Sequence, residues 1–526
     1  MKATFGNPGI LLGLLATLGL AVSLPGATNF VRVRGFSFSP KDLTVAVGDT
    51  VVFSGGNNEH TVTGDGAEPF CGAGFFTTCS VTFSTEGTFA YHCIPHFGLG
   101  MTGVVHAVTV VTSPLTIMIH GQGMVSPDLN GQSLIVGNTY TVTATPVAGF
   151  VFNGWTGGQT SSAPQLTFVM QPNLVLEANF VFNPLPSASG NYNGLFFVED
   201  GVRHESSGAF TFRLMSSGIY SGQTQLAGKR LPFKGQFDFD GRATNTVRQA
   251  GTNNLSMELM LDVSNGSDEI SGRVIDPSAG WTAKLTGDRA PVFANGNASP
   301  YSGSYTLLVT KSDETNEDLG IGTGFGTLKI DAKGKVKLSG ILADGTPVAQ
   351  SVPVSKAGQW PLYAALYGGK GSILSWVSVS TNAAPEASLQ GELSWIKPTL
   401  PRARYYASGF TNEMEMVGSI YQPPRGTKVL PSDRASISFQ GGNLTSALTN
   451  IVRLESNNKV TNLTSNRALT LSIALPTGLF TGSLKANDGA IKTLKFKGAV
   501  LQRQNLGAGF FLGTNESGSV GLEPLP

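Results

Sequence analysis

A short loop near the N-terminal end of this 526-residue chain carries three side chains that can bind a metal: Cys93, His96 and Met101. Their C-x2-H-x4-M spacing lets a thiolate, an imidazole and a thioether from one loop converge on one point. Two imidazoles and a thiolate, with a weak axial thioether, form the ligand set of mononuclear copper sites, because soft sulfur suits Cu(I) and imidazole suits both oxidation states. His60, the only histidine before the loop that begins at Tyr91, supplies the second imidazole. The sequence therefore predicts one copper ion bound by His60, Cys93, His96 and Met101.

Alternating apolar and polar residues surround this loop and predict the strands that position it. Such period-two runs, interrupted by Gly-Asp, are typical of strands with one buried face. About seven short strands in about 85 residues predict a small β-sandwich. The runs lie at residues 36–40, 43–53, 80–83, 88–92 and 103–111.

Three segments of this region resemble the plastocyanin-like cupredoxin family. They are FSFSPKDLTVAVGDTVVF at 36–53, HTVT at 60–63 and the Y-x-C-x-x-H loop that continues to M-x-G at 101–103, and the resemblance spans about residues 29–111. The family implies an electron carrier that cycles one copper ion between Cu(II) and Cu(I). By that resemblance His60, Cys93 and His96 are equatorial ligands and Met101 is axial. It also implies that His96 lies at the surface, where an apolar rim at 97–100 suits the docking of a redox protein.

The chain has three cysteines, and all lie between positions 71 and 93. Because the number is odd, at least one of them cannot form a disulfide within the chain. Cys71 and Cys79 close a short Gly-rich loop, and in an exported protein we expect them to form a disulfide. Two free thiols are the alternative. The disulfide leaves Cys93 available as a thiolate.

His92 stands beside Cys93, and copper nitrite reductases and multicopper oxidases use a histidine in this position to reach a second metal centre. The chain has only six histidines and no H-x-H pair, so a second centre lacks ligands. Strand alternation also turns His92 to the side opposite Cys93. We therefore expect His92 to be an ordinary surface residue, which disfavours a copper oxidoreductase.

The first 27 residues have the composition of an export signal. Lys2 precedes an apolar run at 10–22, and small residues with a proline follow at 23–27. A membrane anchor is the alternative, but crossing a bilayer takes about 20 continuous apolar residues and this run is shorter. We expect an exported bacterial protein, periplasmic, extracellular or at the cell surface, with no transmembrane anchor after cleavage.

Composition, net charge and length predict the fold class, one excluded class of partner and the number of domains. Only 13% of residues are charged, whereas Gly, Ser, Thr, Val and Phe are abundant, which predicts an all-β protein. A net charge of +1 offers no field for neutralising phosphates, so nucleic acid is excluded as a partner. The length predicts three or more domains.

A second unit follows the sandwich at residues 114–183. It combines a G-x-G-x-V-x-P start at 121–127, a GF-x-F-x-x-W-x-G centre at 149–157 and an ANF ending at 178–180. This pattern resembles the divergent internalin-type bacterial surface repeat, which implies a β-rich extracellular spacer or adhesion module without catalytic residues. We expect Phe152 and Trp155 to be core residues and not a ligand platform.

The remainder repeats one pattern of strands and glycine turns. It occurs as YSG and FKG at 220–235, as FTG and FKG at 480–498, and more weakly as LSG at 338–340. Copies so far apart predict duplicated antiparallel β-meander or barrel lobes, which hide their edge strands by closing or pairing. We place them at 187–295, 300–400 and 401–526, after the sandwich at 28–112. No motif in them indicates a function.

The leading hypothesis is an exported type 1 copper protein that carries electrons and is tethered to β-rich surface modules. The alternative is an extracellular structural or adhesive protein that uses the copper domain for copper capture or as a scaffold. The expected partners are a redox protein that docks near His96 and a cell-surface or matrix component. Reduction potential and electron self-exchange rate distinguish the electron-carrier hypothesis from the structural one, because a carrier must cycle quickly between oxidation states.

Overall fold

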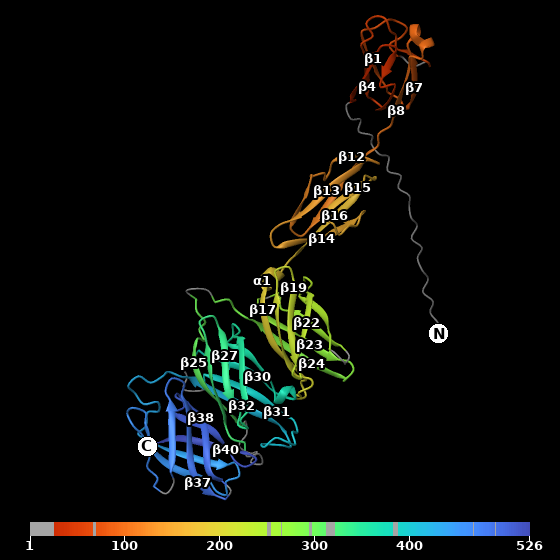
Figure 1. Ribbon diagram of the computed structural model, residues 1–526. Helices are drawn as coiled ribbons and strands as arrows, with labels where there is room; N and C mark the ends of the chain where they lie inside the picture. The colour runs from red at the N-terminus through yellow and green to blue at the C-terminus, as the bar shows by residue number, and fades with distance from the viewer. Residues whose placement is uncertain are drawn as a thin grey trace, which may run out of the picture. The chain divides into compact units, whose positions relative to one another are not determined.

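The computed structural model describes residues 26–66, 70–249, 254–264, 266–293, 297–311, 321–381, 388–465, 468–489 and 491–526. The predicted export signal lies outside these residues, apart from its last two positions. Strands dominate the described chain, and the helical elements are one short α-helix and two 3-10 turns. The all-β prediction is confirmed. The chain divides between Asn183 and Pro184 into two compact units (Figure 1).

The first unit begins with a sandwich of two four-stranded sheets, in the orders β2-β1-β4-β6 and β3-β8-β7-β5. In each sheet one pair is parallel, β1 with β4 and β3 with β8. The strands are β1 (Thr28–Arg34), β2 (Ser37–Ser39), β3 (Asp42–Ala46), β4 (Thr50–Ser54), β5 (Thr63–Gly64), β6 (Thr78–Thr82), β7 (Gly87–His92) and β8 (Thr102–Val108).

Alternation along the strands explains how the two sheets pack. On β4, Val51 and Phe53 are fully buried while their neighbours are partly exposed. Phe53 meets the ring of Tyr91 on the facing sheet edge to face, with centroids 5.2 Å apart. Tyr91 lies two residues before Cys93, so this aromatic contact anchors the strand end from which the metal-binding loop departs.

The second part of the first unit is made of three small sheets, ordered β10-β16-β14, β11-β13-β15 and β12-β9. Trp155 is buried, its ring lies 5.7 Å from that of Phe152, and its indole N–H donates to the carbonyl of Pro164. Trp155 is therefore a core residue, as predicted. The strands are β9 (Thr112–Pro114), β10 (Thr116–His120), β11 (Gly123–Ser126), β12 (Ser133–Ile135), β13 (Thr139–Pro146), β14 (Phe150–Gly157), β15 (Gln165–Val169) and β16 (Val175–Phe182).

The second unit contains three eight-stranded antiparallel sheets, which we call the first, second and third barrel. In each barrel the first strand pairs with the eighth, so that the sheet nearly closes on itself (Figure 1). A short helix, α1 (Leu185–Ala188), precedes the first barrel. Its strands are β17 (Gly190–Phe197), β18 (Gly208–Leu214), β19 (Ile219–Leu226), β20 (Lys229–Gln236), β21 (Arg242–Val247), β22 (Leu255–Leu261), β23 (Glu269–Asp276) and β24 (Trp281–Arg289).

The second and third barrels repeat this meander. The second has β25 (Gly303–Lys311), β26 (Gly324–Ile330), β27 (Lys335–Ile341), β28 (Pro347–Pro353), β29 (Gln359–Leu366), the turn η2 (Tyr367–Gly369), β30 (Gly371–Val379), β31 (Leu389–Lys397) and β32 (Phe410–Ile420). The third has β33 (Arg434–Gly441), β34 (Leu448–Leu454), β35 (Val460–Asn462), β36 (Leu469–Ala474), β37 (Leu479–Asp488), β38 (Ile491–Leu501), β39 (Leu506–Leu512) and β40 (Ser517–Leu525).

The expected boundary at residue 400 is placed too early. The second sheet continues to Ile420, because β32 pairs with β31 on one side and with β25 on the other. The expected boundary falls in the proline-containing segment near 398–402, which is part of the connection between β31 and β32. An eighth strand is needed to cover the edges of β25 and β31, and this requirement outweighs the local turn signal.

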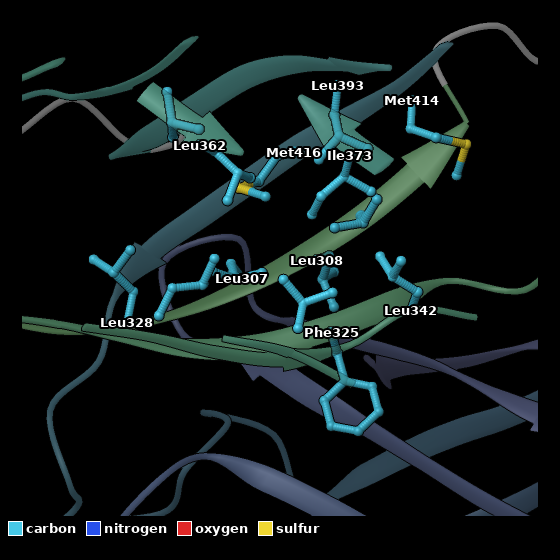
Figure 2. Close-up of a cluster of buried hydrophobic side chains, with 14 of the residues drawn as sticks. Leu307, Leu308, Phe325, Leu328, Leu342, Leu362, Ile373, Leu393, Met414 and Met416 are labelled. Carbon is cyan, nitrogen blue, oxygen red and sulfur yellow. The ribbon is translucent and has the colours of Figure 1, made fainter. Parts of the chain in front are cut away.

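Each barrel is filled by the inward-facing residues of its strands. In the second barrel Leu307, Leu328 and Leu362 belong to one buried cluster (Figure 2). Phe325 points away from the other labelled side chains, and its ring lies 5.9 Å from that of Phe510 in the third barrel. The second core therefore continues into the interface with the third barrel.

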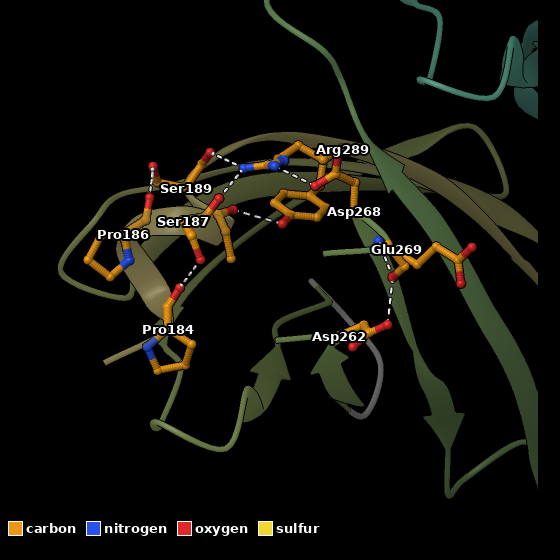
Figure 3. Close-up of polar contacts among 11 residues, drawn as sticks. Pro184, Pro186, Ser187, Ser189, Asp262, Asp268, Glu269 and Arg289 are labelled. Atoms are coloured by element: carbon orange, nitrogen blue, oxygen red, sulfur yellow. Dashed lines mark hydrogen bonds and ion pairs between the residues drawn. The ribbon is translucent and has the colours of Figure 1, made fainter. Parts of the chain in front are cut away.

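Two polar clusters add directional contacts. Arg289, at the end of β24, donates to the carbonyl oxygens of Ser187 and Ser189 and pairs with Asp268, which ties the helix α1 to the first barrel (Figure 3). In the second barrel the Lys397 ammonium lies 2.6 Å from an Asp344 carboxylate oxygen, and both side chains are buried. No helix within the described residues is long and apolar enough to cross a bilayer.

Candidate metal centre

The predicted ligands come from two connections of the sandwich. His60 lies between β4 and β5, whereas Cys93, His96 and Met101 lie in the connection from β7 to β8. That connection folds as a 3-10 turn, η1 (Ile94–Leu99), in which the His96 amide donates to the Cys93 carbonyl at 3.2 Å. The Cys93 amide donates to the Met101 carbonyl at 3.0 Å, which brings the two ends of the loop together.

Three of the four predicted ligands converge. The Cys93 sulfur lies 3.6 Å from His60 Nδ1 and 3.3 Å from His96 Nδ1, and the two nitrogens are 3.1 Å apart. His60 and Cys93 are buried and His96 is half-buried. Met101 is fully buried in the same core cluster as Cys93. Among the described residues this is the single group of three or more His, Cys, Asp or Glu side chains with converging donor atoms.

The donor set fits a soft transition metal. Donors that share one ion at metal–nitrogen and metal–sulfur bond lengths of about 2.0 to 2.3 Å lie about 3.3 to 4.0 Å from one another. The observed 3.1 to 3.6 Å separations are close to this spacing. One thiolate with two imidazoles favours copper over the oxygen-seeking cations. The residues present therefore fit a copper ion.

Electrostatics favour the neutral, metal-binding form of His60. Burial, and next the charge of His96, lower the pKa of His60, and Glu59 opposes this shift. The lower pKa keeps the imidazole of His60 neutral, which is the form that binds metal. The backbone N–H of Thr61 donates to the Cys93 sulfur at 3.4 Å.

Thr61 also links the two ligand-bearing segments. Its hydroxyl oxygen accepts the Ile94 amide proton at 2.8 Å and the Thr63 hydroxyl proton at 3.1 Å. Thr61 is 1% exposed, so the contact with Ile94 is shielded from water on the threonine side. The segment after His60 is thus bonded to the turn that begins at Cys93.

Phe36 is a site residue that the sequence reasoning missed. Its ring lies 4.6 Å from that of His96 and 6.5 Å from that of His60, yet 58% of the residue remains exposed. The alternation Phe36-Ser37-Phe38-Ser39 predicts that both aromatic rings face the same side of a strand. In the structure Phe38 is buried, whereas Phe36 lies in the turn before β2. Only the turn between β1 and β2 brings Phe36 over the histidines.

The disulfide loop packs beside His60. Cys71 is bonded to Cys79, and Cys93 is free and buried. Within that loop the Phe76 amide donates to the His60 carbonyl at 3.2 Å. The bridge therefore restrains a segment that holds the backbone of a predicted ligand.

His92 does not join the group of donors. Its Nδ1 contacts a carboxylate oxygen of Asp65, and its ring lies 4.8 Å from the ring of Phe97. His106, the other histidine of this domain, accepts or donates a hydrogen bond with the Thr88 hydroxyl at 3.0 Å. Neither histidine lies with the converging donors in the described part of the domain.

Comparison with known families gives the same assignment. Residues 28–108 match the family model of copper binding proteins, plastocyanin/azurin family. The N-terminal domain is a plastocyanin-like cupredoxin. Residues 113–184, after the cupredoxin domain, match the divergent InlB B-repeat domain. Both resemblances noted in the sequence are confirmed.

Individual proteins resemble the cupredoxin domain. Chloroplast plastocyanin of Physcomitrium patens is 36% identical, over 18% of this chain and 66% of its own length, so the chain spans just under two thirds of that protein. A Sinorhizobium pseudoazurin structure is 26% identical over 16% of this chain and 74% of that chain, with a TM-score of 0.15.

A more extended match covers 76% of this chain. It is to 85% of a transferrin binding protein B variant from Haemophilus parasuis, at 10% identity and a TM-score of 0.18. TM-scores this low support no conclusion about function.

Proposed function

We propose that this chain is an exported type 1 copper protein that carries electrons through a single ion held by His60, Cys93, His96 and Met101. The observation that carries the proposal is the triangle of Cys93 Sγ, His60 Nδ1 and His96 Nδ1, with edges of 3.1 to 3.6 Å. Buried Met101 would supply the fourth ligand, its thioether sulfur. The bound copper would supply one-electron chemistry between Cu(I) and Cu(II).

The chain's own residues keep the donors in place during such a cycle. The Thr61 amide donates to the Cys93 sulfur, and the Thr61 hydroxyl holds the Ile94 amide. The disulfide loop restrains the His60 backbone from the other side. A donor set that is fixed before the electron arrives needs little rearrangement when the charge changes, which favours fast transfer.

The electron port proposed here is His96, the half-buried ligand. Exposed apolar side chains accompany it: Phe36, whose ring lies 4.6 Å from that of His96, is 58% exposed, and Phe97 and Leu99 of η1 are 56% and 66% exposed. An uncharged rim suits the brief docking of a redox protein. Export to the periplasm or cell surface is supported by the signal-like first 27 residues and by the disulfide.

Metal analysis with visible and paramagnetic-resonance spectra tests this proposal. We expect one copper per chain and an intense thiolate-to-copper absorption in the wild type, and loss of that absorption in Cys93→Ser. His106→Gln, in the same domain but bonded to Thr88, is the matched control and keeps the band. A Cys93→Ser variant with an undiminished band, or two coppers per chain, contradicts the proposal.

A structural or adhesive role is the second candidate, in which the cupredoxin domain captures copper or acts as a scaffold. It is favoured by the extent of the chain outside that domain, which includes the repeat module and three barrels. The electron self-exchange rate of the copper-loaded protein separates the two. Rapid exchange supports a carrier, and very slow exchange supports capture.

A further inference from the structure

The outer face of the third barrel carries a pocket whose polar lining consists of basic and hydroxyl-bearing side chains. Strands β36, β37 and β38 point apolar residues such as Phe480 and Leu494 into the barrel core. The alternate positions face outward and line a cavity of about 810 Å³. This volume lies within the range of small-molecule sites, about 300 to 1,000 Å³. The polar side chains of the lining include Ser472, Thr481, Thr493, Lys495, Lys497 and Arg404.

The second barrel contributes to the lining through the loop between β31 and β32. This loop is fastened to the third barrel, because the Tyr406 hydroxyl lies 2.7 Å from the Ser517 hydroxyl and accepts the Ser517 amide proton at 2.8 Å. Arg404 Nε donates to the Thr514 carbonyl at 3.4 Å. Arg404 and Tyr405 are therefore held against the third barrel at the pocket.

The pocket is cationic and has no acidic residue in its lining. Arg404, Lys495 and Lys497 all line it, and none of them forms an ion pair within the described residues. Lys497 is half-buried, and its ammonium lies 5.1 Å from the centre of the Phe510 ring with no hydrogen-bond acceptor among the described residues. Burial lowers the pKa of this ammonium.

A partly desolvated cation without a counter-charge is unfavourable. Lys397, the fully buried lysine among the described residues, has its carboxylate partner 2.6 Å away. Lys497 lacks such a partner, and an anionic ligand in the pocket would supply one. Phe510 offers a weaker, cation–π contact.

The neutral part of the lining narrows the ligand class. Ser472, Thr481 and Thr493 present short hydroxyls that form no hydrogen bonds within the described residues, and they stand on three adjacent strands. The cavity is also much larger than a lone oxyanion needs. We propose that this pocket binds an acidic oligosaccharide, whose carboxylate or sulfate groups pair with Lys495, Lys497 and Arg404 and whose hydroxyls bond to the serine and threonine hydroxyls.

Calorimetric titration of the full chain tests the proposal. The probes are trigalacturonate, a sulfated carrageenan oligosaccharide and the neutral maltotriose. We expect one or both acidic probes to bind, more weakly as salt rises, and maltotriose not to bind. Loss of charge-assisted hydrogen bonds in Lys495→Gln/Lys497→Gln weakens binding by at least about tenfold. Lys492→Gln, on the same strand but outside the pocket, is the matched control and leaves binding unchanged.

Several outcomes overturn the proposal. They are failure of both acidic probes to bind, equal binding of maltotriose, equal binding of inorganic sulfate, or undiminished binding by the double variant. Lys495→Gln alone changes an exposed position, so it reports on the pocket even where substitution of half-buried Lys497 impairs folding. Copper loading does not enter the measurement, so its result is independent of the metal centre.

Discussion

Replacing Thr61 by valine tests whether the metal centre is held together before metal binds. The substitution keeps the shape of the side chain and removes the oxygen that accepts the Ile94 amide proton at 2.8 Å. The Thr63 hydroxyl also loses a partner, but it retains the Gly72 carbonyl at 3.1 Å. The backbone contact from Thr61 to Cys93 is unaffected, because it uses the amide and not the side chain.

The expected effect follows from the one unsatisfied amide. A partly buried donor without an acceptor costs about 1–3 kcal/mol, and we take about 1–2 kcal/mol because Ile94 itself is exposed. This corresponds to about 5- to 30-fold more frequent opening of the turn η1 in the metal-free protein. Hydrogen exchange resolved by mass spectrometry, on a peptide covering residues 93–99, measures that opening directly.

Thr61→Ser is the matched control. It keeps the hydroxyl and loses one buried methyl group, which costs about 0.8 kcal/mol in packing but leaves the Ile94 amide protected. Exchange at residues 93–99 should therefore rise in Thr61→Val and stay near the wild-type rate in Thr61→Ser. Equal rates for valine and wild type, or for valine and serine, would refute the role assigned to this hydroxyl.

Two further predictions concern the barrels. Lys397→Met leaves the carboxylate of Asp344 buried without its cation, so it should destabilise the second barrel by about 3–5 kcal/mol. Faster hydrogen exchange in β31 measures this loss of stability. A loss below about 1 kcal/mol would contradict the prediction. Asp288 has a pKa raised to about 6, chiefly by burial and next by the charge of Glu269. Its folded form holds a proton more tightly than the unfolded chain, so stability is lost as the pH rises from about 4 through 6. After allowance for the partial exposure of Asp288, Asp288→Asn should stabilise the protein by about 1–2 kcal/mol near pH 7.5 and leave its stability unchanged near pH 4. Thermal unfolding at the two pH values measures this difference. An equal change at both pH values would contradict the raised pKa of Asp288.

The proposed metal ligands could be selected from the sequence because their signal is local. Cys93, His96 and Met101 lie within nine residues, and the chemistry of these side chains restricts the metal they suit. His60 could be added because few histidines compete with it. The strand content and the two family resemblances could likewise be predicted from the sequence, since apolar–polar alternation and turn residues occur in each strand-forming segment.

Tertiary structure alone decided the features that depend on residues far apart in the chain. The closure of the second barrel by β32 rests on backbone pairing with β25, and such pairing is nearly independent of side-chain identity, so it leaves no motif. Phe36 reaches His96, Thr61 reaches Ile94, and the loop before β32 reaches the third barrel, each across a gap that local patterns do not span. The sequence by itself determined which donors are available for copper and that the chain is built of strands. Folding determined which neighbours hold those donors and where unpaired cations gather, because both depend on contacts made only when distant strands close into sheets.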